Sequence, residues 1–130
     1  MGTWGHGTFE NDEASDWLFE LEKAHDLSVI EVALDAVIGA ADTLESPDCT
    51  NALAAAEVVA ALRGKPHAEL PPEVTAWVSR RKETPGALVR KSVSAIDRIL
   101  GDSELKELWA ENDEYGDWES SVHDLKRRLG

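Results

Sequence analysis

An alanine-rich segment near the middle of the chain most limits the folds that this sequence can adopt. Six of the ten residues from Ala52 to Ala61 are alanine. Alanine is the strongest helix former, and its small side chain lets neighbouring helices approach closely. Ser46 and Pro47 are typical of a helix start, and Gly64 is typical of a helix end. The segment therefore predicts a tightly packed helix over residues 47–63.

A second helix is predicted before this one, from Ser28 to about Thr43. Ser28 and Glu31 fit a capping box, and Leu27 and Val32 fit the hydrophobic staple that accompanies it. The segment is apolar on nearly every face, so we expect it to be packed on several sides. Together the two segments predict a central antiparallel hairpin.

Five further helices follow from apolar residues that recur with the 3.6-residue period of an amphipathic helix. They are expected over residues 12–25, from about residue 72, and over residues 84–100, 103–111 and 115–129. No segment alternates with the period of a strand. We therefore expect an all-α fold, a compact bundle of about six to seven helices around the alanine-rich central hairpin, and a single domain over residues 1–130.

The N-terminal segment, residues 2–17, differs from the rest because glycines alternate with bulky rings before any helical pattern begins. Glycine adopts conformations closed to other residues, and aromatic rings bury large areas. One interpretation is an irregular segment held on the bundle by its rings and followed by a helix cap. The other is a small polar site in which His6 bridges to Asp12 or Asp16 and titrates near neutral pH. The candidate residues are Trp4, His6, Phe9, Asp12, Asp16 and Trp17.

Two stretches of the sequence resemble a family of bacterial proteins known as domain of unknown function 4259. The N-terminal stretch is similar to the family's signature through Gly2-x-Trp4-Gly5-x-Gly7-x-Phe9-Glu10-Asn11-Asp12-x-Ala14-x-Asp16-Trp17. The end of the chain is similar through Glu104-Leu105-x-x-Leu108-Trp109, Tyr115, Trp118 and Leu125. The resemblance implies that the chain is one copy of this domain in a bacterial, cytosolic protein. It implies no activity, substrate or catalytic residue.

Charge is distributed unevenly along a chain whose net charge is −13. Residues 1–62 contain 13 acidic residues and a single basic one, Lys23. Such a chain is repelled by phosphate backbones, so no nucleic-acid partner is expected. Basic residues concentrate in residues 80–91, where we expect them to neutralise acidic parts of the same chain or to lie on the surface. An anion site there is the alternative.

The sequence predicts a cytoplasmic protein without a membrane partner. No apolar run approaches the roughly 18 residues of a membrane-spanning helix, and no secretory signal is recognisable at the start. Cys49 is the single cysteine, which excludes an internal disulfide and fits a reducing compartment.

No spacing of catalytic or metal-binding residues is present, so we predict no catalytic residue, metal or cofactor. The four histidines lack metal-ligand spacing, and the sequence has no nucleophile or phosphate-loop motif. Cys49 is expected to fill the core. A hard cation held by Glu10, Asp12, Glu13 or Asp16 is an alternative, although the calcium-loop pattern is absent.

Three hypotheses of function follow. The leading one is a non-enzymatic, protein-binding module that engages a partner with a basic surface, in the manner of an inhibitor or immunity protein. The alternative is an enzyme or metal-binding protein with a site at His6, Asp12 and Asp16. The third is self-association through exposed tryptophans, so the oligomeric state stays open.

Deleting residues 2–9 tests the structural interpretation of the N-terminal segment. If Trp4 and Phe9 are buried, the deletion is expected to lower the free energy of unfolding by about 3–5 kcal/mol for each ring. Thermal melting of the shortened and full-length chains measures this, and an unchanged melting temperature would contradict it.

Overall fold

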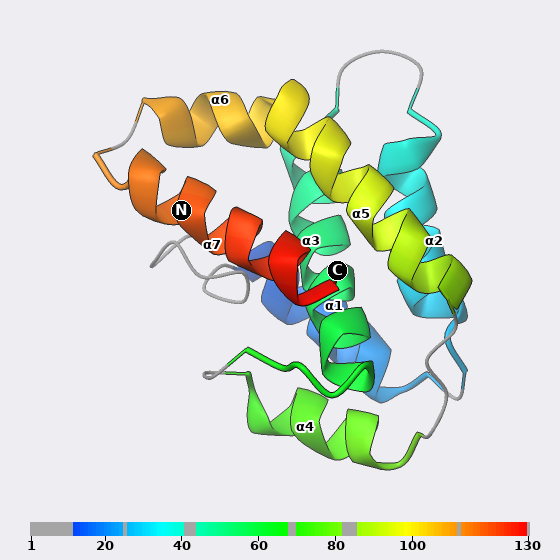
Figure 1. Ribbon diagram of the computed structural model, residues 1–130. Coiled ribbons are helices and arrows are strands. Elements are labelled where there is room, and N and C mark those ends of the chain that lie inside the picture. Colours follow the sequence, from blue (N-terminus) through cyan, green and yellow to red (C-terminus); the bar gives the residue numbers. More distant parts are fainter. Residues whose placement is uncertain are drawn as a thin grey trace.

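The computed structural model describes residues 12–24, 26–40, 44–67, 70–81, 86–111 and 113–129. This part of the chain contains helices and no strand, as the sequence predicts (Figure 1). The helices are α1 (Asp12–Glu22), α2 (Ser28–Ile38), α3 (Ser46–Leu62), α4 (Pro72–Ser79), α5 (Gly86–Gly101), α6 (Glu104–Ala110) and α7 (Tyr115–Leu129).

Helix α3 is the centre of the bundle, and each of the other six helices contacts it. From Ala52 to Ala61 every residue of α3 is buried. Figure 1 shows α2 running antiparallel beside α3, with α5 and α7 crossing in front and α1 behind. The predicted central hairpin is therefore present, and α3 is its more deeply buried member.

Small side chains allow this crowding around a single helix. Ala54, Ala55, Ala56 and Ala60 have no exposed surface. A larger residue at any of these positions would have to displace a neighbouring helix, and overpacking of this kind typically costs about 1–3 kcal/mol. The alanines thus decide how many helices can meet on α3.

The predicted end of α3 at Gly64 is confirmed. Gly64 has a φ angle of +86°, in the region that favours glycine. Its N–H donates to the Ala61 carbonyl oxygen at 2.9 Å, and the Lys65 N–H donates to the Ala60 carbonyl oxygen at 2.9 Å. This pair of bonds is the Schellman motif, which satisfies the last carbonyls of the helix.

The predicted capping box at the start of α2 is wrong. Ser28 is already the first residue of the helix, and the preceding Leu27 offers no side-chain cap. The Asp26 carboxylate takes the capping role, because its Oδ1 accepts hydrogen bonds from the Ser28 backbone N–H at 3.0 Å and from the Ser28 hydroxyl at 2.7 Å. The helix dipole also favours a negative charge before the start of a helix.

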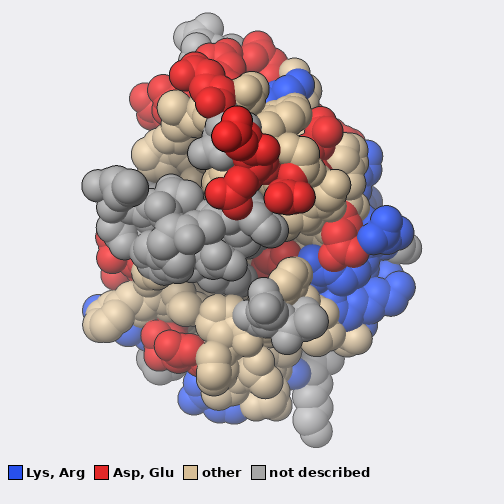
Figure 2. All heavy atoms as spheres, turned by 90° about the vertical axis from the view of Figure 1, so that its left-hand side faces the viewer, with Lys and Arg blue, Asp and Glu red and all other residues tan. Residues whose placement is uncertain are grey.

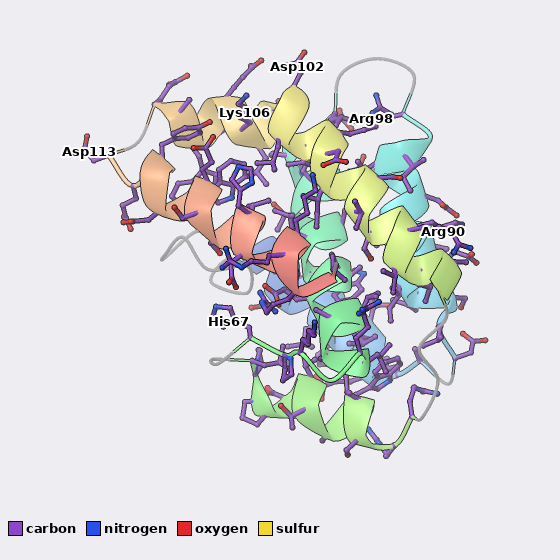
Figure 3. The ribbon with its side chains drawn as sticks, viewed as in Figure 1. His67, Arg90, Arg98, Asp102, Lys106 and Asp113 are labelled. Atoms are coloured by element: carbon purple, nitrogen blue, oxygen red, sulfur yellow. The ribbon has the colours of Figure 1, made fainter. Side chains whose placement is uncertain are left out.

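Helices α1 and α2 end earlier than predicted, at Glu22 and Ile38. At the end of α2, Arg98 of α5 binds the free carbonyl oxygens (Figure 3). Its Nη1 donates to the carbonyl oxygens of Val37, Ile38 and Ala40, each at 2.9 Å. A cation at this helix end is favoured by the dipole, and it fixes α5 to α2.

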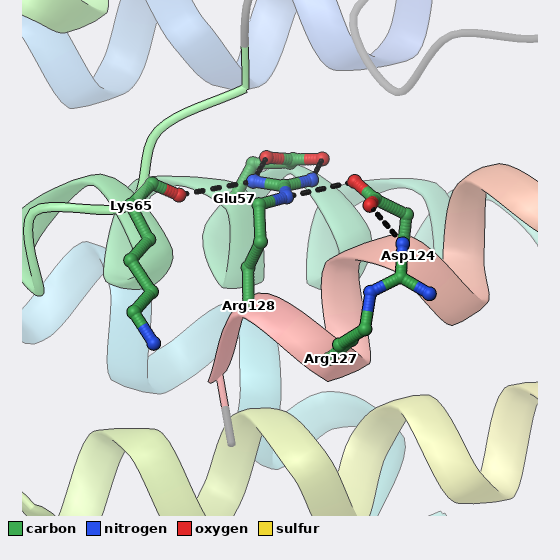
Figure 4. Close-up of polar contacts among 5 residues, drawn as sticks. All are labelled: Glu57, Lys65, Asp124, Arg127 and Arg128. Carbon is green, nitrogen blue, oxygen red and sulfur yellow. Dashed lines mark hydrogen bonds and ion pairs between the residues drawn. The ribbon is translucent and has the colours of Figure 1, made fainter.

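A buried ion pair fixes α7 to the centre of α3 (Figure 4). Glu57 is 1% exposed, and both of its carboxylate oxygens accept hydrogen bonds of 2.9 Å from the guanidinium of Arg128. The Arg128 Nε also donates to Asp124 at 2.8 Å, and this bond lowers the pKa of the Asp124 carboxyl group. Residues 126–128 are basic and lie in the last turn of α7, where the helix dipole favours cations, and Arg128 also reaches α3.

Replacing Arg128 tests the importance of this ion pair. Arg128→Met is expected to lower the free energy of unfolding by about 3–5 kcal/mol, because it leaves the Glu57 carboxylate buried without its cation. The double variant Glu57→Leu with Arg128→Met is expected to recover most of the loss, since no charge then stays buried. Urea denaturation measures both variants.

Arg127→Met is the matched control. Arg127 pairs with the same Asp124 but is exposed, so its loss is expected to cost at most about 1 kcal/mol. Equal destabilisation by Arg127→Met and Arg128→Met would contradict the role of the buried pair.

Candidate functional site

The structure describes the side chains of two of the six residues predicted for the N-terminal site. On α1, Asp16 is exposed, whereas Trp17 points inward and is buried. The grouping of a histidine with acidic residues in this segment therefore stays a prediction. Outside the described side chains lie Trp4, His6, Phe9 and Asp12.

A groove of about 330 Å³ opens beside Trp17. It lies between α1, α2 and α3, and its lining is mostly apolar. Trp17 lines it from α1, and α2 supplies the largest share of the lining. The apolar lining residues are Trp17, Val29, Val32, Ala33 and Ala36.

The α2 wall of the groove is a single ridge of the helix. Val29, Val32, Ala33 and Ala36 are spaced so that they share one face. Val32 is 67% exposed, more than Phe19 or any other large apolar side chain in the described part of the chain. The prediction that α2 is packed on several sides is confirmed, because α2 contacts α1, α3 and α5, but this ridge faces the groove.

Sequence reasoning missed this ridge for a physical reason. When a helix is apolar on nearly every face, its pattern does not say which face the neighbouring helices leave uncovered. The sequence does show that this helix has more apolar residues than the single stripe that a surface helix needs. The predicted hydrophobic staple between Leu27 and Val32 is wrong, because the exposure of Val32 removes the burial that a staple requires.

Carboxylates stand on two sides of the groove. Glu20 lines it from α1 and Asp48 from α3. Neither forms an ion pair with any residue that the structure describes. Their negative charge is therefore not balanced by a neighbouring cation in the described part of the fold.

The acids on the other side of α2 differ in this respect. Glu31 and Asp35 face α5, where the Nζ atom of Lys91 lies 3.0 Å from a carboxylate oxygen of each. Hydrogen bonds to Asp35 and Glu31 raise the pKa of Lys91. For Lys91, the prediction that basic residues neutralise acidic parts of the same chain is confirmed.

Arg81 has a similar internal role at the end of α4. Its guanidinium lies 4.1 Å from the centre of the Trp77 ring and donates to the Ala24 carbonyl oxygen at 3.1 Å. The two neighbouring basic residues that are described, Arg80 and Arg90, are exposed. Lys82 lies outside the described residues.

The prediction that Cys49 fills the core is confirmed. Its side chain has no exposed surface, and burial raises the pKa of its thiol to about 11. At neutral pH the group is a thiol, which is a poor nucleophile compared with the thiolate. Cys49 is therefore a packing residue.

The described tryptophans do not support the hypothesis of self-association through exposed tryptophans. Trp17, Trp77 and Trp118 are buried. Trp109 is half-buried and stacks on Trp118, with 6.3 Å between the ring centres. These rings fill gaps between helices.

Exposed acidic residues also gather on α6 and on the turn that leads to α7 (Figure 2). Glu107 lies on α6, Glu111 directly follows this helix, and Asp113 projects away from the turn (Figure 3). In the ranges that the structure describes, no three His, Cys, Asp or Glu side chains come together as a metal-binding group. None of the helices described is both long and apolar enough to cross a membrane.

Comparison with known proteins identifies a family. A family model described as "Domain of unknown function (DUF4259)" matches residues 2–121. The searches of curated proteins and of solved structures gave no match.

Proposed function

We propose that this chain, which belongs to the DUF4259 family, is a non-enzymatic protein-binding module whose groove receives an apolar, basic segment of a partner protein. The family description assigns no activity, so the proposal is based on the residues of this chain. The observation that carries it is an apolar groove with carboxylates on two of its sides.

The apolar lining supports binding of a macromolecular partner. Burial of apolar surface contributes roughly 25 cal/mol per Å², so covering an exposed residue such as Val32 is favourable. The groove is at the lower end of the roughly 300–1,000 Å³ range of small-molecule pockets. An open groove of this size suits side chains that project from a larger partner.

The charge around the groove supports a basic partner. Glu20 and Asp48 form no ion pair within the described structure, and an approaching Lys or Arg would supply a partner. The excess of acids in residues 1–62 adds a long-range field of the same sign. Complementary charge of this kind raises association rates and selects among partners.

The polar residues of the groove support binding over catalysis. Ser28 supplies a hydroxyl, but that hydroxyl donates to the Asp26 carboxylate, and none of the described lining residues is a histidine. The described lining therefore lacks the nucleophile and base pair of covalent catalysis. The alternative site at His6, Asp12 and Asp16 is favoured by no observation on the described residues.

A photo-crosslinking reagent attached at position 32 tests the proposal. The reagent attaches to a Val32→Cys variant selectively, because the natural Cys49 is buried. In an extract of the source cells, the variant is expected to capture partner segments rich in apolar and basic residues, mapped by mass spectrometry. Adding Glu20→Lys is expected to lower the yield about threefold or more, since it reverses a charge at the groove.

Leu108→Cys provides the control position, because Leu108 is an exposed apolar residue of α6 outside the groove lining. Capture of the same segments from positions 32 and 108, or capture of segments without basic residues, would contradict the proposal.

A further inference from the structure

We infer that the segment bound in the groove is an amphipathic helix of about two to three turns, with two neighbouring apolar anchors and basic residues on both flanks. The inference rests on the proposed function and specifies the partner at that same site. It follows from the shape of the α2 ridge, from the backbone chemistry of the groove walls and from the positions of the two carboxylates.

The α2 ridge has the form that a second helix packs against. Val29, Val32, Ala33 and Ala36 follow the i, i+3, i+4, i+7 row of a helix surface, and such rows receive the side chains of a neighbouring helix. The ridge spans the seven residues of one heptad step, which is about 10 Å along the axis. Ala33 and Ala36 are small, so the two backbones can approach closely.

The walls of the groove exclude an extended peptide on chemical grounds. The walls that the structure describes are helices, and beyond the first turn of each helix the backbone groups already bond within it. An extended peptide would bury its own N–H and C=O groups against them without finding partners, whereas a strand edge would supply partners. A helical segment brings these groups already paired.

The volume of the groove sets the number of anchors. A cavity of about 150 Å³ accepts a benzene-sized ring. The groove holds about 330 Å³, so it takes two such side chains. Two anchors that enter one groove from a helix lie three or four residues apart.

The positions of the carboxylates set the charge pattern of the partner. Glu20 belongs to α1 and Asp48 to α3, so the two stand on different walls of the groove. A helix lying on the α2 ridge can reach both carboxylates when Lys or Arg residues flank its apolar stripe on both sides. Long basic side chains also cover apolar surface with their methylene groups.

Synthetic peptides test the helical conformation. The first peptide has about 14 residues of leucine and lysine, with leucines at the i, i+3, i+4 and i+7 positions. The second has the same sequence with D-lysine at two central positions, which breaks the helix but keeps charge and composition. The third carries glutamate in place of lysine. Fluorescence anisotropy of labelled peptides gives Kd, and circular dichroism gives the helicity gained on binding.

The first peptide is expected to bind and to gain helicity, and the second and third are expected to bind at least about tenfold more weakly. Ala36→Trp places a bulky ring on the exposed ridge and is expected to weaken binding of the first peptide about tenfold or more. Glu107→Lys reverses an exposed acid on α6, outside the groove, and is expected to change Kd less than about twofold.

Four results would overturn the inference. Equal binding of the first peptide and of the second, which contains D-lysine, would show that the bound segment is not a helix. The proposed function would then stand. Equal effects of Ala36→Trp and Glu107→Lys on Kd would show that the helix binds outside the groove. No binding of either basic peptide would show that such a helix does not bind. The crosslinking experiment tests the proposed function separately. A dimer that sedimentation detects and that Ala36→Trp abolishes would make a second copy of this chain the occupant.

Discussion

The position of α7 in the bundle depends on one buried carboxylate at the point where the helices meet. Glu57 lies in the middle of α3, which contacts all of the other described helices. A carboxylate at this depth is costly unless a cation and hydrogen bonds accompany it. Arg128 supplies both, with two bonds of 2.9 Å, and a further bond joins it to Asp124. The last turn of α7 is thereby fixed to one place on α3, and apolar packing alone would not specify that place so narrowly.

The groove follows from the way in which α2 is held in the bundle. Helix α2 packs on α3 and α5, where Arg98 binds its last carbonyls and Lys91 holds its acids. These polar contacts fix the rotation of α2 about its axis. Val32 and Ala36 then face the opposite side, toward α1. An apolar residue is left exposed because the rotation of α2 is decided by its contacts with α5.

Much of this fold could be predicted from the sequence, because helix caps and apolar periodicity are local signals. Gly64 ends α3 as predicted, and Ser103 caps the predicted helix α6 through a 3.0 Å bond from the Lys106 N–H. The contacts of Glu57 and Arg128 could not be predicted, since 71 positions separate them and nothing in the local pattern joins them. The groove could not be predicted for the same reason, as its three walls come from three separate helices. Trp4, His6 and Phe9, three of the six residues that the sequence favours as a site, lie outside the described part of the chain.

The preference of the groove for a basic partner, which we propose, follows from the acidic residues and carbonyl groups that the basic residues of the bundle contact. Lys91 and Arg98 of α5 act on α2, and Lys126 of α7 pairs with Asp97 of α5 at 2.7 Å. These basic residues belong to the later helices, and their positions are set by the contacts that hold the helices together. Helix α1 and the first turn of α3 receive no such cation among the described contacts, so Glu20 and Asp48 keep their charge beside an apolar surface. A chain that uses its cations to join its own helices thus leaves the complementary charge to be supplied by whatever covers the groove.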